Sequence, residues 1–145
     1  MYPYRKIEEL IGKTLVSAEG RVGGDMIVFT DDAGQQYKLY HEQDCCESVE
    51  IDDIVGDLQV LVGSPILVAR EDANVPSKGY MIQIDFGDGK TEVCRDESYT
   101  WTFYNIATIN GYVTIKWYGT SGGNYSESVT FGIVGHDVHA KDYWA

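Results

Sequence analysis

Residues 101–118, WTFYNIATINGYVTIKWY, decide the fold of this chain. Two runs rich in aromatic and β-branched residues flank Asn110-Gly111, a dipeptide that strongly favours a two-residue hairpin turn. Such a turn places Ile109 opposite Tyr112 and fixes the pairing of every residue further along the two strands. Because side chains alternate along a strand, one face of the hairpin is apolar and is predicted to enter the core. That face consists of Tyr104, Ile106, Val113, Ile115 and Trp117.

The opposite face of the same hairpin mixes aromatic rings with polar groups and is our candidate binding surface. If the following five-residue loop leads into a third neighbouring strand, Asn124 and Ser126 join this face. Its predicted members are Trp101, Phe103, Asn105, Lys116, Tyr118, Asn124 and Ser126. Flat rings separated by amide, hydroxyl and ammonium groups can stack on a planar ligand and bind its polar edges. The same pattern is also typical of a second core layer or of a subunit interface.

The rest of the chain predicts a mainly β protein, rich in antiparallel hairpins, with a short N-terminal helix over residues 4–12. One hairpin joins residues 26–30 to 35–40, with Met26 and Val28 on the same apolar face as Tyr37 and Leu39. A second joins 80–86 to 91–95, and shorter strands are expected over 15–19 and 65–70. Residues 51–63 have helical spacing and predict a short helix or turn that begins at Asp52 or Asp53. We expect a single domain over residues 1–145 with a weakly structured tail over 134–145.

The composition limits the kinds of partner. The chain carries 23 acidic and 11 basic side chains, a net charge of −12, which disfavours a broad nucleic-acid surface or an anionic membrane. A small anionic ligand held by a few local cations stays possible, and Arg70 is one candidate cation. Three cysteines, including one adjacent pair, do not form a disulfide framework, so we expect a reduced, cytoplasmic protein.

The densest group of reactive side chains lies at residues 41–47, HEQDCCE. His41, Cys45 and Cys46 are weak candidate metal ligands, with Cys94 as a fourth, but adjacent cysteines suit a tetrahedral ion poorly. A Cys–His nucleophile is another interpretation. The third is structural, with at least one thiol buried and His41 bonded to a carboxylate, and under it no residue is catalytic and no cofactor is expected.

Several stretches together resemble a known group of proteins. They are YHEQDCCESV at 40–49 with IDDI at 51–54, WTFY at 101–104, GYVTI at 111–115, WYG at 117–119 and YSESV at 125–129. They resemble a family of small proteins of unknown function encoded by bacteriophages and their hosts. The resemblance implies a phage origin rather than a chemistry.

These observations lead to three hypotheses of function. The first is a phage protein that sequesters a nucleotide-like immune signal, with the ring on the aromatic face and the phosphates near Lys116 and an arginine. The second is a metal-assisted or Cys–His enzyme centred on His41, Cys45 and Cys46. The third is an acidic inhibitor of a host defence protein. Exposed edge strands and the spare aromatic face also predict a homo-oligomer.

Overall fold

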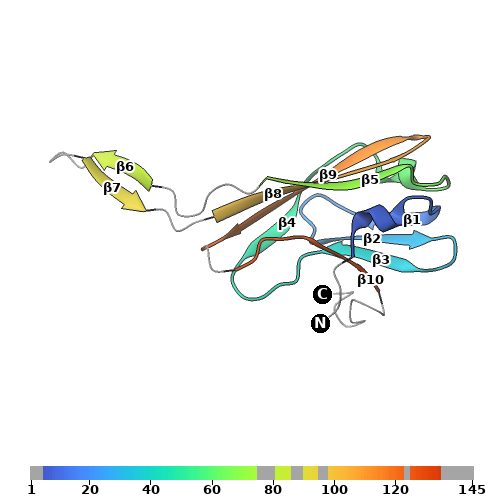
Figure 1. Cartoon of the computed structure of the whole chain (residues 1–145), viewed down its shortest axis with the longest axis horizontal. Coiled ribbons are helices and arrows are strands. Elements are labelled where there is room, and N and C mark those ends of the chain that lie inside the picture. Colours follow the sequence, from blue (N-terminus) through green and yellow to red (C-terminus); the bar gives the residue numbers. More distant parts are fainter. Residues whose placement is uncertain (1–4, 75–80, 86–89, 95–97, 123–124, 135–145) are drawn as a thin grey trace.

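The computed structural model describes residues 5–74, 81–85, 90–94, 98–122 and 125–134, and it confirms a mainly β protein. Two four-stranded antiparallel sheets form the body of the molecule (Figure 1). The first sheet contains, in spatial order, β1 (Leu15–Gly20), β2 (Met26–Asp31), β3 (Gln36–Tyr40) and β10 (Thr130–Ile133). The second contains β4 (Ser48–Val55), β9 (Gly111–Ser121), β8 (Ser98–Thr108) and β5 (Val68–Asn74).

A separate two-stranded hairpin extends from the sandwich. It consists of β6 (Met81–Asp85) and β7 (Lys90–Cys94), as the sequence predicts, and lies beyond the end of β8 in Figure 1. The predicted tail over 134–145 falls almost entirely outside the described residues. The single domain over 1–145 therefore stays a prediction.

Neither predicted helix forms an α-helix. Within the described part of the first of them, from residue 5 to 12, the chain forms only the 3₁₀ turn η1 (Ile7–Leu10), which buries its two terminal apolar residues. The predicted element over 51–63 is wrong in its first half, because residues up to Val55 belong to β4. The second half is the 3₁₀ turn η2 (Leu58–Leu61), and its N-cap is Asp57, whose carboxylate accepts from the Gln59 backbone N–H. Val49 and Ile51 are two residues apart and both buried, which is the spacing of a strand. The helical spacing in the sequence holds only from Ile54 onward.

The β8–β9 hairpin has the predicted faces but a different turn. Thr108 pairs with Gly111, so the two turn residues are Ile109 and Asn110, and the register differs from the prediction by two residues. A shift of two keeps every side chain on its face, and all five predicted core residues are buried. The predicted turn with Asn110 and Gly111 as its two central residues is wrong, because Gly111 pairs with Thr108, and the side-chain amide of Asn110 donates to Ser64 Oγ at 3.1 Å.

The β2–β3 hairpin differs by one residue, and this changes its faces. Phe29 pairs with Tyr37 and Ile27 with Leu39, so the core receives Ile27 and Phe29 in place of the predicted Met26 and Val28. The reason is Asp31, which ends β2 and organises a turn one residue later than the loop between the two predicted strands. Its carboxylate accepts the backbone N–H groups of residues 33 and 35, and its second oxygen accepts the Tyr37 hydroxyl.

The last strand crosses to the other sheet. β10 pairs with β3, with Phe131 opposite Leu39, and not with β9. The predicted third strand beside β9 is therefore wrong. The predicted strand over 65–70 begins later, at Val68.

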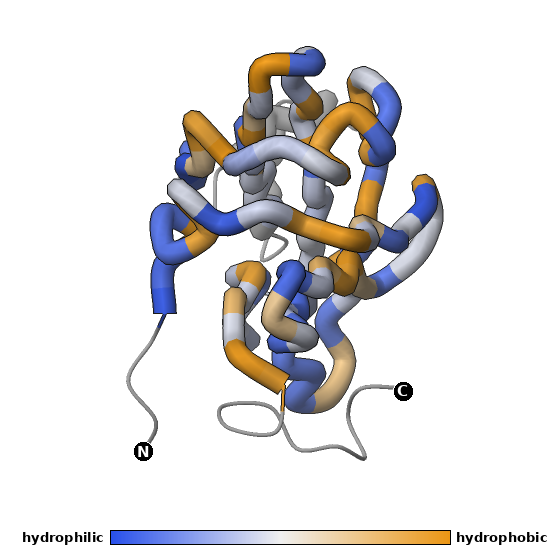
Figure 2. The backbone as a smooth tube through the Cα atoms, turned by 90° about the vertical axis from the view of Figure 1, so that its right-hand side faces the viewer, coloured by the Kyte–Doolittle hydropathy of each residue, from blue (hydrophilic) through white to orange (hydrophobic). Residues whose placement is uncertain are grey.

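The core lies between the two sheets. Its largest fully buried side chains come from both layers and include Trp117, Tyr104, Phe29, Leu15 and Leu39. Hydrophobic and hydrophilic residues succeed one another along the strands (Figure 2), as expected for sheets with one face in the core.

Gly56 ends β4 in a conformation that other residues adopt at a cost. Its φ is +102°, and a Cβ at this position would lie 2.8 Å from the Tyr112 carbonyl oxygen. We expect Gly56→Ala to lower the free energy of unfolding by about 1–3 kcal/mol. Gly122→Ala is the matched control, because its Cβ would meet nothing within 4 Å. Equal melting temperatures for the two variants would show that the backbone at Gly56 accommodates a side chain without strain.

Candidate functional site

The outer face of the second sheet carries a cluster of four aromatic rings, which we call the aromatic face. Trp101 pairs with Tyr118 across β8 and β9, and their ring centroids are 4.5 Å apart. Phe103 stacks on Trp101 at 6.4 Å with an interplanar angle of 15°, and Tyr99 lies 6.4 Å from Tyr118. Tyr99 is exposed and the other three rings are half-buried. Alternation along β8 therefore brings these rings to solvent on the face opposite Tyr104 and Ile106.

Polar groups lie beside the rings, as predicted. Lys116 pairs with Phe103, and Asn105 is the next residue of β8 on the same face, two positions after Phe103. Asn105 Oδ1 accepts the Thr114 hydroxyl at 2.7 Å, and its amide nitrogen donates to Asp72 at 3.3 Å. The amide is thus held with a fixed orientation at the edge of the aromatic face.

Carboxylates surround the aromatic face on the neighbouring strands. Glu50 pairs with Tyr118, Asp53 with Lys116, and Asp72 with Phe103. These pairings place three acidic side chains on the same side of the sheet as the rings. The sequence did not predict this feature, because Asp53 was expected in a helix or turn and Asp72 lay beyond the predicted strand over 65–70. The surroundings of the rings are accordingly close to neutral or slightly acidic, despite Lys116.

The other predicted ligand-binding residues do not all join this face. Arg70 does join it, since Arg70 on β5 pairs with Asn105 on β8. Its guanidinium already lies 3.3 Å from the Asp72 carboxylate. Ser126 does not, because the segment after β9 leaves the sheet, and its hydroxyl contacts the Ser128 hydroxyl at 2.7 Å. Asn124 lies outside the described residues.

The second candidate site is the loop over residues 41–47, which is organised around the buried carboxylate of Glu47. This carboxylate accepts the backbone N–H groups of Asp44 and Cys45, both at 2.9 Å, and the Gln43 side-chain amide at 3.2 Å. It also lies 2.7 Å from His41 Nε2. Burial opposes the charged form, but the N–H groups of Cys45 and Asp44 and the His41 ring outweigh it and lower the pKa of Glu47 to about 2.

His41 joins two stretches that are far apart in the sequence. Its Nδ1 lies 2.6 Å from the Ser128 carbonyl oxygen, and its Nε2 faces Glu47. Both ring nitrogens therefore meet protein oxygens, and the ring links the loop to the stretch that contains Ser128. The residue before Ser128, Glu127, is also buried and accepts the hydroxyls of Thr100 and Ser121. The HEQDCCE and YSES stretches thus form one polar structure beside the sandwich.

The cysteines differ from the prediction of a buried thiol. Cys45 and Cys46 are both exposed, because the loop turns outward after His41. They are disulfide-bonded to each other, so the prediction of reduced cysteines is wrong for this pair. Cys94 ends β7 in the separate hairpin and does not belong to this loop. Within residues 5–74 and the other described segments, no three His, Cys, Asp or Glu side chains gather to hold a metal ion. Neither of the described helical turns has the length and apolar character needed to span a membrane.

Comparison with known proteins gives a family but no chemistry. No curated protein and no solved structure matches the chain. A family model described as a domain of unknown function, DUF7448, matches residues 8–131, which include the whole second sheet, the first sheet up to the middle of β10, the aromatic face and the His41–Glu47 loop. The chain therefore belongs to the DUF7448 family of domains of unknown function.

Proposed function

We propose that this protein is a non-enzymatic binding protein that captures a small ligand with a planar ring on the aromatic face. We further propose that the ligand is a nucleotide-like signal of a host defence system, and that the protein is of phage origin and acts in the host cytoplasm. The observation that carries the proposal is the solvent-facing group of Trp101, Phe103 and Tyr118, with two ring contacts of 4.5 and 6.4 Å.

The arrangement supports ring capture in two ways. Aromatic residues on a rigid sheet need little reorganisation before a ring stacks on them, and stacking a base on one such ring contributes ~1–3 kcal/mol. Beside the rings, Asn105 is held by Thr114 and Asp72 and can present its amide to the edge of a base. Lys116 lies directly opposite Phe103 in the pairing of β8 with β9 and supplies a cation beside the rings.

The charges on this face restrict the ligand. Glu50, Asp53 and Asp72 oppose a highly charged anion, and Arg70 is already paired. We therefore expect a ligand with few phosphate charges, whose phosphates lie toward Lys116 and whose ring makes most of the contact. A cyclic dinucleotide and an ADP-ribose derivative are the two classes to test first.

Binding should depend on the rings and not on the fold alone. We expect Trp101→Ala to weaken the binding of a cyclic dinucleotide or ADP-ribose, measured by isothermal titration calorimetry, by about 5- to 150-fold. Tyr112→Ala is the matched control, because Tyr112 is an exposed aromatic residue at the far end of β9. Equal affinities of the two variants for the ligand that binds the wild type would place the site elsewhere.

A second candidate is an acidic inhibitor of a basic host protein. The carboxylates of Glu50, Asp53 and Asp72 around the aromatic face, together with the net charge of −12, favour this alternative. The contacts of His41 with Glu47 and Ser128 favour both binding functions over a Cys–His enzyme. We also propose that the protein is a homo-oligomer, with the sheet edges as the surfaces to test.

A further inference from the structure

One side of the sandwich is held together at both ends and open in the middle. β1 is an edge strand of the first sheet and β4 is an edge strand of the second. At one end, the Gly23 N–H donates to the Ile51 carbonyl at 2.8 Å, and the Ile51 N–H donates to Gly24 at 2.9 Å. At the other end, Leu15 forms a parallel bridge with Val62, and the Gly63 N–H donates to the Leu15 carbonyl.

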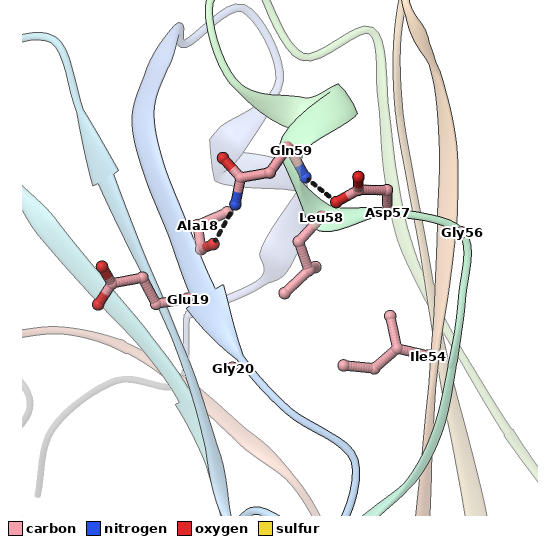
Figure 3. Close-up of a pocket in the computed structure, with 8 residues that line it drawn as sticks. All are labelled: Ala18, Glu19, Gly20, Ile54, Gly56, Asp57, Leu58 and Gln59. Atoms are coloured by element: carbon pink, nitrogen blue, oxygen red, sulfur yellow. Dashed lines mark hydrogen bonds between the residues drawn. The ribbon is translucent and has the colours of Figure 1, made fainter.

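Between these two connections lies a cavity of about 530 Å³. Its walls come from the middle of β1 and from the segment that joins β4 to η2. Ile54 and Leu58 point into it, whereas the side chain of Glu19 points away (Figure 3). The lining residues are Ala18, Glu19, Gly20, Ile54, Gly56, Asp57, Leu58 and Gln59. The volume is in the range of known ligand sites.

The outer edge of β1 faces this cavity. The Ala18 carbonyl accepts a hydrogen bond from Gln59 Nε2 at 3.3 Å, so the peptide groups of Ala18 point away from β2. By the period of two, those of Gly20 point the same way. The Ala18 carbonyl is therefore bonded by the exposed side chain of Gln59, at the position where the backbone N–H of an added strand would otherwise donate.

The rim suits a polypeptide backbone. A Cβ at Gly20 would meet the Ile27 side chain, and the positive φ of Gly56 disfavours any residue but glycine. Both positions leave the approach free of side chains. The charged residues among those that line the cavity are Glu19 and Asp57, both acidic and exposed.

From this arrangement, we propose that the cavity is a groove for an extended peptide segment of a partner protein. The segment adds as a strand to the outer edge of β1, displaces Gln59 from Ala18, and seats a small apolar side chain on Ile54 and Leu58. Basic side chains on either side of it lie near Glu19 and Asp57. This mode of recognition takes affinity from main-chain hydrogen bonds and specificity from alternate side chains. The groove is distinct from the aromatic face and does not depend on the function proposed for it.

The test uses the full-length protein and the peptide acetyl-Lys-Val-Lys-Val-Lys-amide, followed by NMR. We expect saturable shifts of the amide signals of Ala18, Glu19 and Gly20. A strand that pairs through one edge uses the N–H groups of alternate residues only. We therefore compare two peptides, one methylated on the main-chain nitrogens of the two valines and one on those of the three lysines. One of them should lose affinity at least tenfold and the other should keep it.

Two variants complete the test. Gln59→Ala removes the competing amide and should strengthen binding at least twofold. Glu19→Lys should weaken it several-fold, whereas Asp32→Lys, an equal charge change at an exposed loop residue, should not. Equal affinities for the two methylated peptides, or no shifts at residues 18–20 at millimolar peptide, would overturn the proposal.

Discussion

Replacing Trp117 with alanine should lower the free energy of unfolding by about 3–5 kcal/mol and remove most soluble protein. Trp117 is fully buried in β9 between Ile51 on β4 and Thr102 on β8. Removing the indole leaves a cavity at the centre of the sandwich that rigid strands cannot fill. Chemical denaturation, or the soluble yield if the variant does not fold, measures the effect.

The matched change is Trp117→Phe, which should cost much less. Among the described residues, the indole Nε1 of Trp117 is a buried donor without a hydrogen-bond partner. Phenylalanine keeps most of the ring volume and removes this unpaired donor, which is itself unfavourable. If phenylalanine and alanine destabilise the protein equally, the indole N–H makes an important bond and the core does not depend on ring volume alone.

Replacing Glu47 with glutamine should lower the melting temperature at pH 7 on the order of 10 °C. A glutamine amide keeps one acceptor but turns an NH₂ group toward N–H donors of Asp44, Cys45 or His41. The loop over 41–47 and its attachment to Ser128 would both loosen. Glu50→Gln is the control, because the Glu50 carboxylate lies on the solvent-exposed side of β4.

The effect of Glu47 should depend on pH in a defined window. Its pKa is lowered from 4.5 to about 2 in the folded protein, so its stabilisation is fully present above pH 4.5. It is lost as the pH falls from about 4.5 to 2. Thermal unfolding should therefore show the gap between wild type and Glu47→Gln closing across that range. A gap that stays constant down to the lower end of the range would mean that the charge of Glu47 does not stabilise the fold.

Local pattern predicted the fold class and the faces of the central hairpin. Alternation in residues 101–118 separates Trp117 from Tyr118 whatever the turn, because a register error of two leaves each face unchanged. The same reasoning failed at β2–β3, where the Asp31 carboxylate sets the turn and shifts the pairing by one. Turn chemistry that depends on a side-chain acceptor is not visible in hydrophobic periodicity.

The parts of the candidate sites that the sequence did not predict depend on contacts between distant residues. His41 meets Ser128 across 87 positions, and β10 pairs with β3 instead of the adjacent β9. These choices follow from how the two sheets stack, which no local pattern encodes. The acidic surroundings of the aromatic face were missed for a related reason, since Glu50 and Asp53 reach it only because β4 is a strand.

The measurement that tests the central claim most directly is mass spectrometry of compounds released by heating the purified protein. The protein should be produced in a host whose nucleotide-based defence is active, alongside Trp101→Ala and the control Tyr112→Ala. Ligand capture on the aromatic face predicts a ring-bearing, nucleotide-like compound from the wild type and from Tyr112→Ala, and little or none from Trp101→Ala. The same compound in equal amount from Trp101→Ala, or no compound from the wild type, would contradict capture at this site.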